Sequence, residues 1–251
     1  MKTVYYHIPK CGGTTIGQLA YMNFGSSKVL SVYAKDPLDN YDLIRDELDL
    51  SKHTFMKSHV PFGSIAAVEG SDCFTILRDP RRRLISLMLD VKRRQSHYLY
   101  KSLGGDNFSV NAFMTKAPIW ESDNVMVRYL LGPRGFTKKP IEHADYEKAT
   151  DVLFNHLSCF GIQERFRDTL QLVASKSGMS FVADMKVNAA GARDTIELSG
   201  VCRFPDAYKF DQMLYDAALS RFDQQLHGLR SVPVIRARWL QFALRVLAKI
   251  R

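Results

Sequence analysis

The chain opens with the stretch TVYYHIPKCGGTT, residues 3–15, which combines an apolar run, two adjacent glycines and two threonines. The β-branched and aromatic residues at its start predict a strand over Thr3–Ile8. The amphipathic spacing after the glycines predicts a helix over Thr14–Phe24. A strand that passes through a glycine-rich turn into a helix is typical of α/β folds with a mostly parallel sheet.

The alternation of strand-like and helix-like segments continues outward through the first third of the chain. Further strands are predicted at Lys28–Tyr33, Phe55–Val60 and Cys73–Leu77. Further helices are predicted at Tyr41–Leu48, near Phe62–Val68, and from Pro80 to about Tyr100. We therefore expect a three-layer α/β architecture in which helices flank a parallel sheet.

The chain becomes mostly helical after Gly104. The predicted helices there are Val110–Lys116, Asp123–Leu131, His143–Leu157, Glu164–Ser177 and about Asp206–His227. A fifth strand is predicted at Cys159–Gln163, and Met185–Ser199 has the composition of a loop. Because no internal repeat or low-complexity linker divides the chain, residues 1–230 are predicted to form one domain, followed by a basic helix at 231–251.

The glycine-rich turn has the composition of an anion-binding loop. At such strand-to-helix turns, backbone N–H groups and the positive end of the helix dipole bind phosphate or sulfate. Gly12 and Gly13 let a ligand approach the main chain. Thr14 and Thr15 add hydroxyl donors, and Lys10 adds a mobile cation. Lys10 precedes the glycines, whereas the lysine of a Walker A loop follows them, so this is not an ordinary ATP or GTP loop.

A second anion-binding element follows the predicted strand Cys73–Leu77. Arg78 ends that strand, at the edge where open α/β sheets bind ligands. Asp79 can cap the next helix, and Pro80 fits the first turn of that helix. The forked guanidinium of Arg78 suits a phosphate, which Ser86 on the adjoining helix can also contact.

These two elements resemble those of the sulfotransferases that use 3′-phosphoadenosine 5′-phosphosulfate (PAPS), in the branch of the uronosyl (heparan) 2-O-sulfotransferases and bacterial carbohydrate sulfotransferases. HIPKCGGTT is similar to the family's 5′-phosphosulfate loop, and RDPRRRLIS to its 3′-phosphate element, RDPxxRxxS. Weaker similarity continues through Asn124–Gly132, FGIQERFRDTLQLV and KVNAAG to about His227. The resemblance implies a P-loop NTPase-like sulfotransferase fold and transfer of a sulfuryl group from PAPS to a hydroxyl, which leaves 3′-phosphoadenosine 5′-phosphate (PAP).

The resemblance also implies roles for particular residues. The sulfate and the 5′-phosphate would be held by Lys10, Cys11, Gly12, Gly13, Thr14 and Thr15, and the 3′-phosphate by Arg78 and Ser86. Cys11 departs from the Thr or Ala often found in this loop, but this position is expected to contribute its backbone N–H. Lys186 and Asn188 lie in a loop that closes over the nucleotide in such enzymes.

An acceptor hydroxyl must lose a proton when it attacks, so a base is expected beside the donor. His59 ends the predicted strand Phe55–Val60, at the same sheet edge as Lys10 and Arg78. In the resembling 2-O-sulfotransferases a His-Val pair at this point carries the catalytic base, which implies that role for His59. Some relatives have a second histidine where this chain has Lys57, which is a candidate for orienting the acceptor.

The expected chemistry is an in-line displacement at sulfur that needs no metal ion. His59 takes the hydroxyl proton, and Lys10 neutralises the charge that develops on the departing phosphate oxygen. Loop N–H groups stabilise the sulfuryl oxygens. His7 is expected to be structural, although His7 and Glu164 are the next candidates for the base.

Composition limits the alternatives. A formal net charge of +9 favours anionic partners. A P-loop kinase is disfavoured by the position of Lys10 and by the lack of an acidic strand end for Mg²⁺. A nucleic-acid-binding protein is disfavoured because basic and aromatic residues are not interleaved and no reader motif is present. The four cysteines are isolated, which predicts no metal site and suits a reducing, cytoplasmic setting.

The partners are less well determined. The resemblance favours a saccharide acceptor, but a lipid, a small metabolite and a tyrosine remain open, as does the oligomeric state. The segment Ile235–Arg251 predicts a basic amphipathic helix. Its apolar face either lies peripherally on an anionic membrane or packs on the catalytic domain or a second subunit. No apolar run is long enough to span a bilayer.

Overall fold

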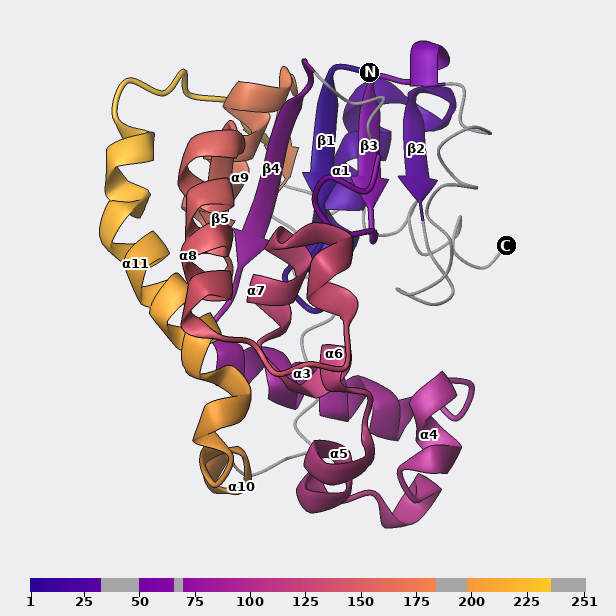
Figure 1. The fold of residues 1–251 in the computed structure, drawn as a ribbon. Coiled ribbons are helices and arrows are strands. Elements are labelled where there is room, and N and C mark those ends of the chain that lie inside the picture. The colour runs from indigo at the N-terminus through magenta and orange to yellow at the C-terminus, as the bar shows by residue number, and fades with distance from the viewer. Residues whose placement is uncertain (33–49, 66–69, 184–197, 236–251) are drawn as a thin grey trace.

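The protein is described by a computed structural model that covers residues 1–32, 50–65, 70–183 and 198–235. Its centre is a parallel sheet of five strands in the order β2-β3-β1-β4-β5 (Figure 1). The strands are β1 Thr3–Tyr6, β2 Val29–Val32, β3 Phe55–Ser58, β4 Asp72–Leu77 and β5 Cys159–Ile162. Each lies within a predicted strand or extends it by one residue, so the prediction of a parallel α/β sheet is confirmed.

Two neighbouring residues of β5 show that helices cover both faces of the sheet. The ring of Phe160 packs against those of Phe154 and Phe222, on one face. Gly161 points to the opposite face, where a Cβ would lie 2.3 Å from the methyl group of Thr169. The helices concerned are α8 His143–Asp151 with its π-helical continuation Val152–His156, α9 Phe166–Ser177 and α11 Lys209–Leu226. The predicted three-layer arrangement is therefore present, with α1 Gly13–Phe24 behind the sheet in Figure 1.

A second group of helices lies below the carboxyl ends of the strands in Figure 1. It comprises α3 Pro80–Arg93, α4 Tyr98–Ser102, α5 Val110–Lys116 and α10 Leu198–Cys202, which share a small apolar core around Leu84, Leu87, Met88, Leu99, Phe113 and Val201. Between this group and the sheet run α6 Ile119–Ser122 and α7 Val125–Leu130. Short 3₁₀ turns occur at Ser26–Lys28, Leu50–Lys52, Gly105–Asn107, Gly132–Phe136, Gln163–Arg165 and Pro205–Tyr208.

The continuous helix predicted from Pro80 to about Tyr100 is wrong, because α3 ends at Arg93 and residues 94–97 separate it from α4. Arg94 has an extended backbone, and its guanidinium lies 2.5 Å from the carboxylate of Asp90. The ring of His97 then accepts a hydrogen bond of 3.2 Å from the N–H of Leu99 and so caps a new helix, α4. A side-chain cap therefore begins a new helix, although no glycine or proline in the sequence indicates a break.

The start of α3 is confirmed as predicted. The carboxylate of Asp79 accepts a hydrogen bond of 2.9 Å from the N–H of Arg82, and Pro80 occupies the first turn. The capped end faces the sheet, which places α3 directly after β4. The second anion-binding element is thus a strand that passes through a capped turn into a helix, as its sequence predicts.

Several smaller predictions need correction. The described part of the helix predicted near Phe62–Val68, residues 62–65, forms turns. The loop predicted to extend to Ser199 ends earlier, because α10 begins at Leu198. Two-residue strands, β6 Val182–Ala183 and β7 Val234–Ile235, pair in parallel, so the helix predicted to begin at Ile235 begins in a strand. The predicted helix Tyr41–Leu48 and residues 236–251 lie outside the described residues.

The predictions about cysteines and membrane spans can be compared with the structure. All four cysteines carry free thiols; Cys11 and Cys159 are buried, Cys73 is half-buried and Cys202 is exposed. Cys73 and Cys159 both lie in strands of the sheet, but only Cys159 is fully buried. Among the helices of the described ranges, none combines the length and the apolarity that a membrane span needs.

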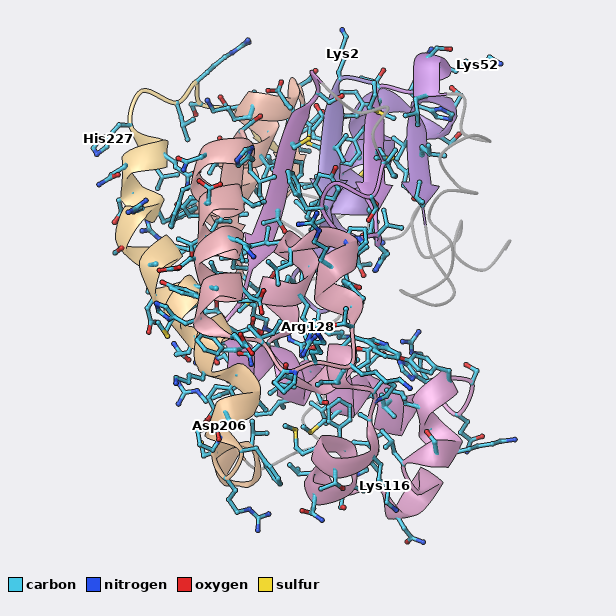
Figure 2. All side chains as sticks on the ribbon, viewed as in Figure 1. Lys2, Lys52, Lys116, Arg128, Asp206 and His227 are labelled. Carbon is cyan, nitrogen blue, oxygen red and sulfur yellow. The ribbon has the colours of Figure 1, made fainter. Side chains whose placement is uncertain are left out.

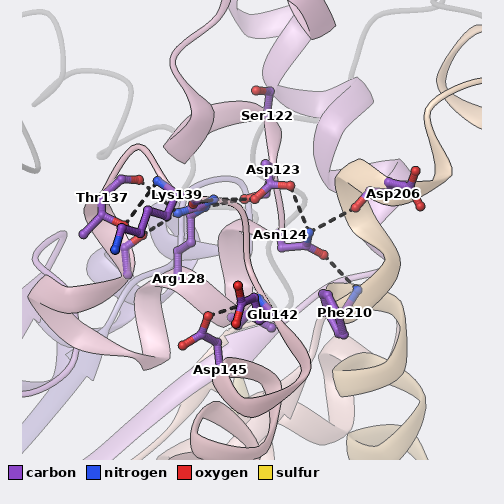
Figure 3. A network of polar contacts seen from close by, with 12 residues as sticks. Ser122, Asp123, Asn124, Arg128, Thr137, Lys139, Glu142, Asp145, Asp206 and Phe210 are labelled. Carbon is purple, nitrogen blue, oxygen red and sulfur yellow. Dashed lines mark hydrogen bonds and ion pairs between the residues drawn. The ribbon is translucent and has the colours of Figure 1, made fainter.

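A buried polar network ties α7 to its surroundings (Figure 3). Arg128 is fully buried in the interior, whereas Lys116 points outward at the far end of the molecule (Figure 2). The guanidinium of Arg128 donates to the carbonyls of Asp123, Gly135, Thr137 and Lys139 at 2.8, 2.7, 3.3 and 2.9 Å, and also to the Asp123 carboxylate. All three of its nitrogens are therefore paired within the protein.

The same network joins α7 to α11. Asn124 adopts a left-handed backbone conformation, with φ of 42°. Its side-chain amide donates to the carbonyl of Asp206, in the 3₁₀ turn before α11, and accepts from the N–H of Phe210 in α11. The carboxylate of Asp211 accepts hydrogen bonds from the N–H groups of Met126 and Val127, at 3.1 and 2.9 Å, and so caps α7. Burial raises the pKa of Asp211 to about 6.

Candidate active site

The carboxyl ends of neighbouring strands bring the predicted site residues together. His59 follows β3, His7 follows β1, and Arg78 follows β4, in adjacent positions across the sheet. The register pairs Tyr6 with Ser58, and the N–H of His7 continues the ladder by donating to the carbonyl of Ser58 at 2.7 Å. Parallel strands place their carboxyl ends at one edge, where α/β folds bind ligands.

The anion loop has the backbone conformation that its glycines predict. Gly12 has φ of 85° and stands immediately before α1, and Lys10 also has a positive φ of 72°. The N–H groups of Gly12, Gly13 and Thr14 donate to no other group in the described part of the chain. They begin a helix of 12 residues that has no side-chain cap. Successive unpaired N–H groups at a helix start form a site for an anion.

Close packing also requires both glycines. A Cβ on Gly12 would lie 2.5 Å from the side-chain amide oxygen of Gln163. A Cβ on Gly13 would lie 2.0 Å from the ring of His7. The two glycines therefore let residues from the ends of β5 and β1 lie directly against the loop. Because Gly12 and Gly13 have no side chain, neighbouring residues can pack against the loop and an anion can approach its backbone.

Lys10 bridges the loop and α3. Its ammonium lies 2.9 Å from the carboxylate of Asp90, and both side chains are about one quarter exposed. Asp90 lies one turn after Ser86 on α3, so Lys10 reaches the helix that carries the second anion-binding element. The guanidinium of Arg78 donates to the carbonyl of Lys10 at 2.9 Å, which joins the two elements directly.

His59, the predicted base, lies beside His7. Nδ1 of His7 and Nε2 of His59 are 2.7 Å apart. Burial and the nearby charge of Lys57 lower the pKa of His59 from its usual 6.5 to about 3. Burial, His59 and two lysines lower the pKa of His7 well below its usual value. Both rings are therefore neutral at pH 7, which is the protonation state that a base needs.

The remaining predicted residues are placed as follows. Lys57 is buried in β3, and its side chain runs against Gly17 of α1. Thr15 is buried and Thr14 is exposed at the start of α1.

Cys11 lies within the loop, and its N–H donates to the carbonyl of Ile8 at 3.2 Å. Burial raises the pKa of the Cys11 thiol to about 12, so Cys11 is not a thiolate nucleophile. Lys186 and Asn188 lie outside the described residues.

Arg83 is a buried residue near this site for which no role was predicted, although it is the second arginine of the pattern RDPxxRxxS. Its side chain is 1% exposed, and it donates one hydrogen bond, of 3.1 Å, to the carbonyl of Glu121. Its Nε and Nη1 atoms have no partner in the described residues. RDPRRRLIS contains this arginine, but three consecutive arginines favour a solvated cluster, and only the third is buried.

Unpaired polar atoms gather around the loop. Besides the two nitrogens of Arg83, they include Nε of Arg78, Nε2 of His7 and the amide oxygen of Gln163. Buried polar atoms are normally paired, so a cluster without protein partners is typical of a site that binds a polar ligand. Within the described ranges, no group of three or more His, Cys, Asp or Glu side chains is placed to hold a metal ion.

Comparison with known proteins agrees with this geometry. A family model described as "Sulfotransferase family" matches residues 1–167, which is about two thirds of the chain and includes both anion-binding elements. The chain therefore belongs to the sulfotransferase family, and it is a transferase. A search of curated proteins finds no match.

Proposed function

We propose that the protein transfers the sulfuryl group of PAPS to a hydroxyl of a saccharide. The observation that carries the proposal is the pair of anion-binding elements at one sheet edge, joined by the hydrogen bond from Arg78 to the carbonyl of Lys10. PAPS carries anionic groups at both its 5′ and its 3′ end. A loop with unpaired N–H groups and a separate arginine on the next strand suit such a ligand.

In this proposal the anion loop holds the phosphosulfate. The unpaired N–H groups of Gly12, Gly13 and Thr14 lie at the start of α1 and stabilise charge on the sulfuryl and 5′-phosphate oxygens. Lys10 exchanges Asp90 for the phosphate and neutralises the charge on the leaving oxygen. The forked donor of Arg78, with Ser86, holds the 3′-phosphate.

His59 takes the proton from the attacking hydroxyl. The oxygen forms a bond to sulfur while the bond from sulfur to the 5′-phosphate oxygen breaks, and the proton passes to the His59 ring. In the chain without nucleotide, burial and the charge of Lys57 keep His59 neutral. Bound PAPS brings several negative charges to this edge, which offset the charge of Lys57 and make His59 a stronger base. Lys57 and the net charge of +9 favour an acceptor that is itself anionic, such as a uronic acid saccharide.

The proposal is tested by incubating the protein with ³⁵S-labelled PAPS and a panel of saccharides, lipids and tyrosine peptides. We expect label in a saccharide fraction, and at least about 100-fold slower labelling with the His59→Ala variant. His227→Ala is the matched control, because His227 is exposed and points away from the molecule (Figure 2). Label in lipid or peptide alone would contradict the acceptor assignment. Absence of transfer to every class, with no binding of PAP, would contradict the proposal as a whole.

A further inference from the structure

His7 and His59 form a pair that links two strands. His7 is the first residue after β1, and His59 is the first residue after β3. The rings cross at 78° with centroids 4.1 Å apart, and Nδ1 of His7 lies 2.7 Å from Nε2 of His59. That separation is a hydrogen bond, in which one nitrogen must donate and the other accept.

The two histidines differ in their surroundings. His7 is 6% exposed and is enclosed by Gly13 of the anion loop and by the ring of Tyr5, 5.3 Å away. His59 is half-buried at the edge of the sheet. Among the described residues, Lys57 of β3 and Lys10 of the loop are the cations that lower the pKa of His7. The enclosed ring of His7 cannot reach an acceptor itself, but it can act through His59.

We propose that His7 is the positioning partner of His59, engaging Nε2 so that the proton of the acceptor hydroxyl is received at Nδ1. This inference rests on the proposed function and names a second histidine for the same proton transfer. It assigns to His7 a role in the reaction rather than a place in the core.

The nitrogen that carries the proton in each ring determines the direction of the hydrogen bond. A neutral His59 that is to receive a proton at Nδ1 carries its own proton at Nε2. The bond therefore runs from Nε2–H of His59 to Nδ1 of His7, and His7 carries its proton at Nε2. After transfer, His59 is an imidazolium whose Nε2–H still donates to His7, so the neutral partner stabilises the charge where it forms. The hydroxyl proton then resides on Nδ1 of His59, and no further group is consumed.

Substitutions of His7 separate hydrogen bonding from packing. His7→Leu places an apolar side chain of similar size beside Gly13 and removes the hydrogen bond to His59. His7→Asn places an amide oxygen close to the former position of Nδ1, where it can accept from Nε2–H of His59. We expect His7→Leu to lower kcat by about 10- to 100-fold, within the range that proton transfer contributes, and His7→Asn to recover most of that loss.

Both variants are compared for PAP-induced thermal stabilisation and for sulfate transfer from PAPS to the saccharide that the panel identifies. Equal loss in His7→Leu and His7→Asn, or full activity in His7→Leu, would overturn the role of the hydrogen bond. A protein that neither binds PAP nor transfers sulfate shows a failure of the proposed function instead, because the wild type then fails as well.

A spectroscopic measurement tests the pair without relying on any variant or acceptor. In the ¹⁵N-histidine-labelled protein with PAP bound, a coupling across the hydrogen bond is expected between Nδ1 of His7 and Nε2 of His59, with both rings protonated at Nε2. Absence of the coupling, or a proton on Nδ1 of His59, would overturn the inference. Binding of PAP in the same sample shows separately whether the proposed function stands.

Discussion

The network around Arg128 and the surroundings of the anion loop are both buried and polar, but they differ in how their hydrogen bonds are satisfied. All guanidinium nitrogens of Arg128 are paired with carbonyls or with Asp123 (Figure 3). Around the loop, His7, Arg78 and Arg83 each retain a buried nitrogen without a partner among the described residues. Arg83 and Arg128 are similarly inaccessible, at 1% and 0% exposure, so burial alone does not distinguish them.

The difference assigns different roles to the two regions. A buried polar network that is fully paired holds elements in fixed positions, here α7 against α11 and the turn after α7. A region that leaves polar atoms unpaired sacrifices stability unless a ligand completes its hydrogen bonds. We therefore expect changes at the loop to alter binding and turnover, and changes in the network to alter stability.

The largest effect is expected from His59→Ala. Loss of a general base lowers turnover by about 10²- to 10⁴-fold, while PAP binding stays close to that of the wild type. The measurements are kcat for sulfate transfer and the affinity for PAP, with His227→Ala as control. Turnover that survives in a folded His59→Ala protein would place the base elsewhere, and Glu164 would then be the next residue to test.

The second prediction concerns Arg128→Met. Removal of this guanidinium leaves the Asp123 carboxylate without its cation and several carbonyls without their donor, so the free energy of unfolding should fall by about 3–5 kcal/mol. Denaturant unfolding measures the loss, and the fraction that remains folded should bind PAP normally. Arg134→Met, on the exposed surface, should change stability by less than about 0.5 kcal/mol. If Arg128→Met loses its affinity for PAP but keeps its stability, the network serves ligand binding and the assignment of the two regions is wrong.

The third prediction is a pH dependence at Asp211. Its folded pKa of about 6 lies above the usual 3.8, so its contribution to stability is present at low pH and is lost as pH rises from about 4 to about 6. The expected loss is on the order of 2–3 kcal/mol, relative to Asp211→Asn, which cannot ionise. Subtracting the two stability curves removes the opposite trend of His7 and His59, whose lowered pKa values favour the folded state as pH rises.

Asp216→Asn serves as the control for that measurement, because Asp216 lies on the same helix but is exposed. Its stability curve should run parallel to that of the wild type between pH 4 and pH 6. If Asp211→Asn also runs parallel to the wild type, the buried carboxyl does not titrate in this range.

The fourth prediction is a loss of nucleotide affinity in Arg78→Ala. A hydrogen bond to a charged group contributes about 1.5–3 kcal/mol, so PAP should bind about 10- to 150-fold more weakly. Arg82→Ala is the matched control, because Arg82 lies on the same element with an exposed side chain, and only its backbone N–H contacts the Asp79 cap. Calorimetric titration with PAP measures both. Unchanged affinity in Arg78→Ala removes this residue from the site.

Local sequence patterns predicted the parts of the molecule that local interactions determine. The strands of the sheet follow from their apolar β-branched and aromatic runs, and the start of α3 follows from Asp79 and Pro80. The positive φ of Gly12 follows from its place between a strand and a helix. These features depend on residues within a few positions of one another, so the sequence alone is sufficient.

Contacts between distant segments could not be predicted in the same way. Two such contacts are the pair His7–His59 and the pair Lys10–Asp90. They depend on how β1, β3 and α3 are placed relative to one another, and their spacing in the sequence does not predict them. The break after Arg93 depends on a histidine cap, which is rarer than a glycine or proline stop. The strands β6 and β7 are two residues long, too short to show a period.

In the proposed function, two separate anion sites select a nucleotide phosphorylated at both its 5′ and its 3′ end. It is tested most directly by titrating the wild-type protein with PAP, with AMP and with ATP plus Mg²⁺ under the same conditions. We expect PAP to bind at least about 10-fold more tightly than AMP, which is the smallest contribution expected of Arg78, and more tightly than ATP with Mg²⁺. Equal affinities for PAP and AMP, or tighter binding of ATP with Mg²⁺, would contradict it.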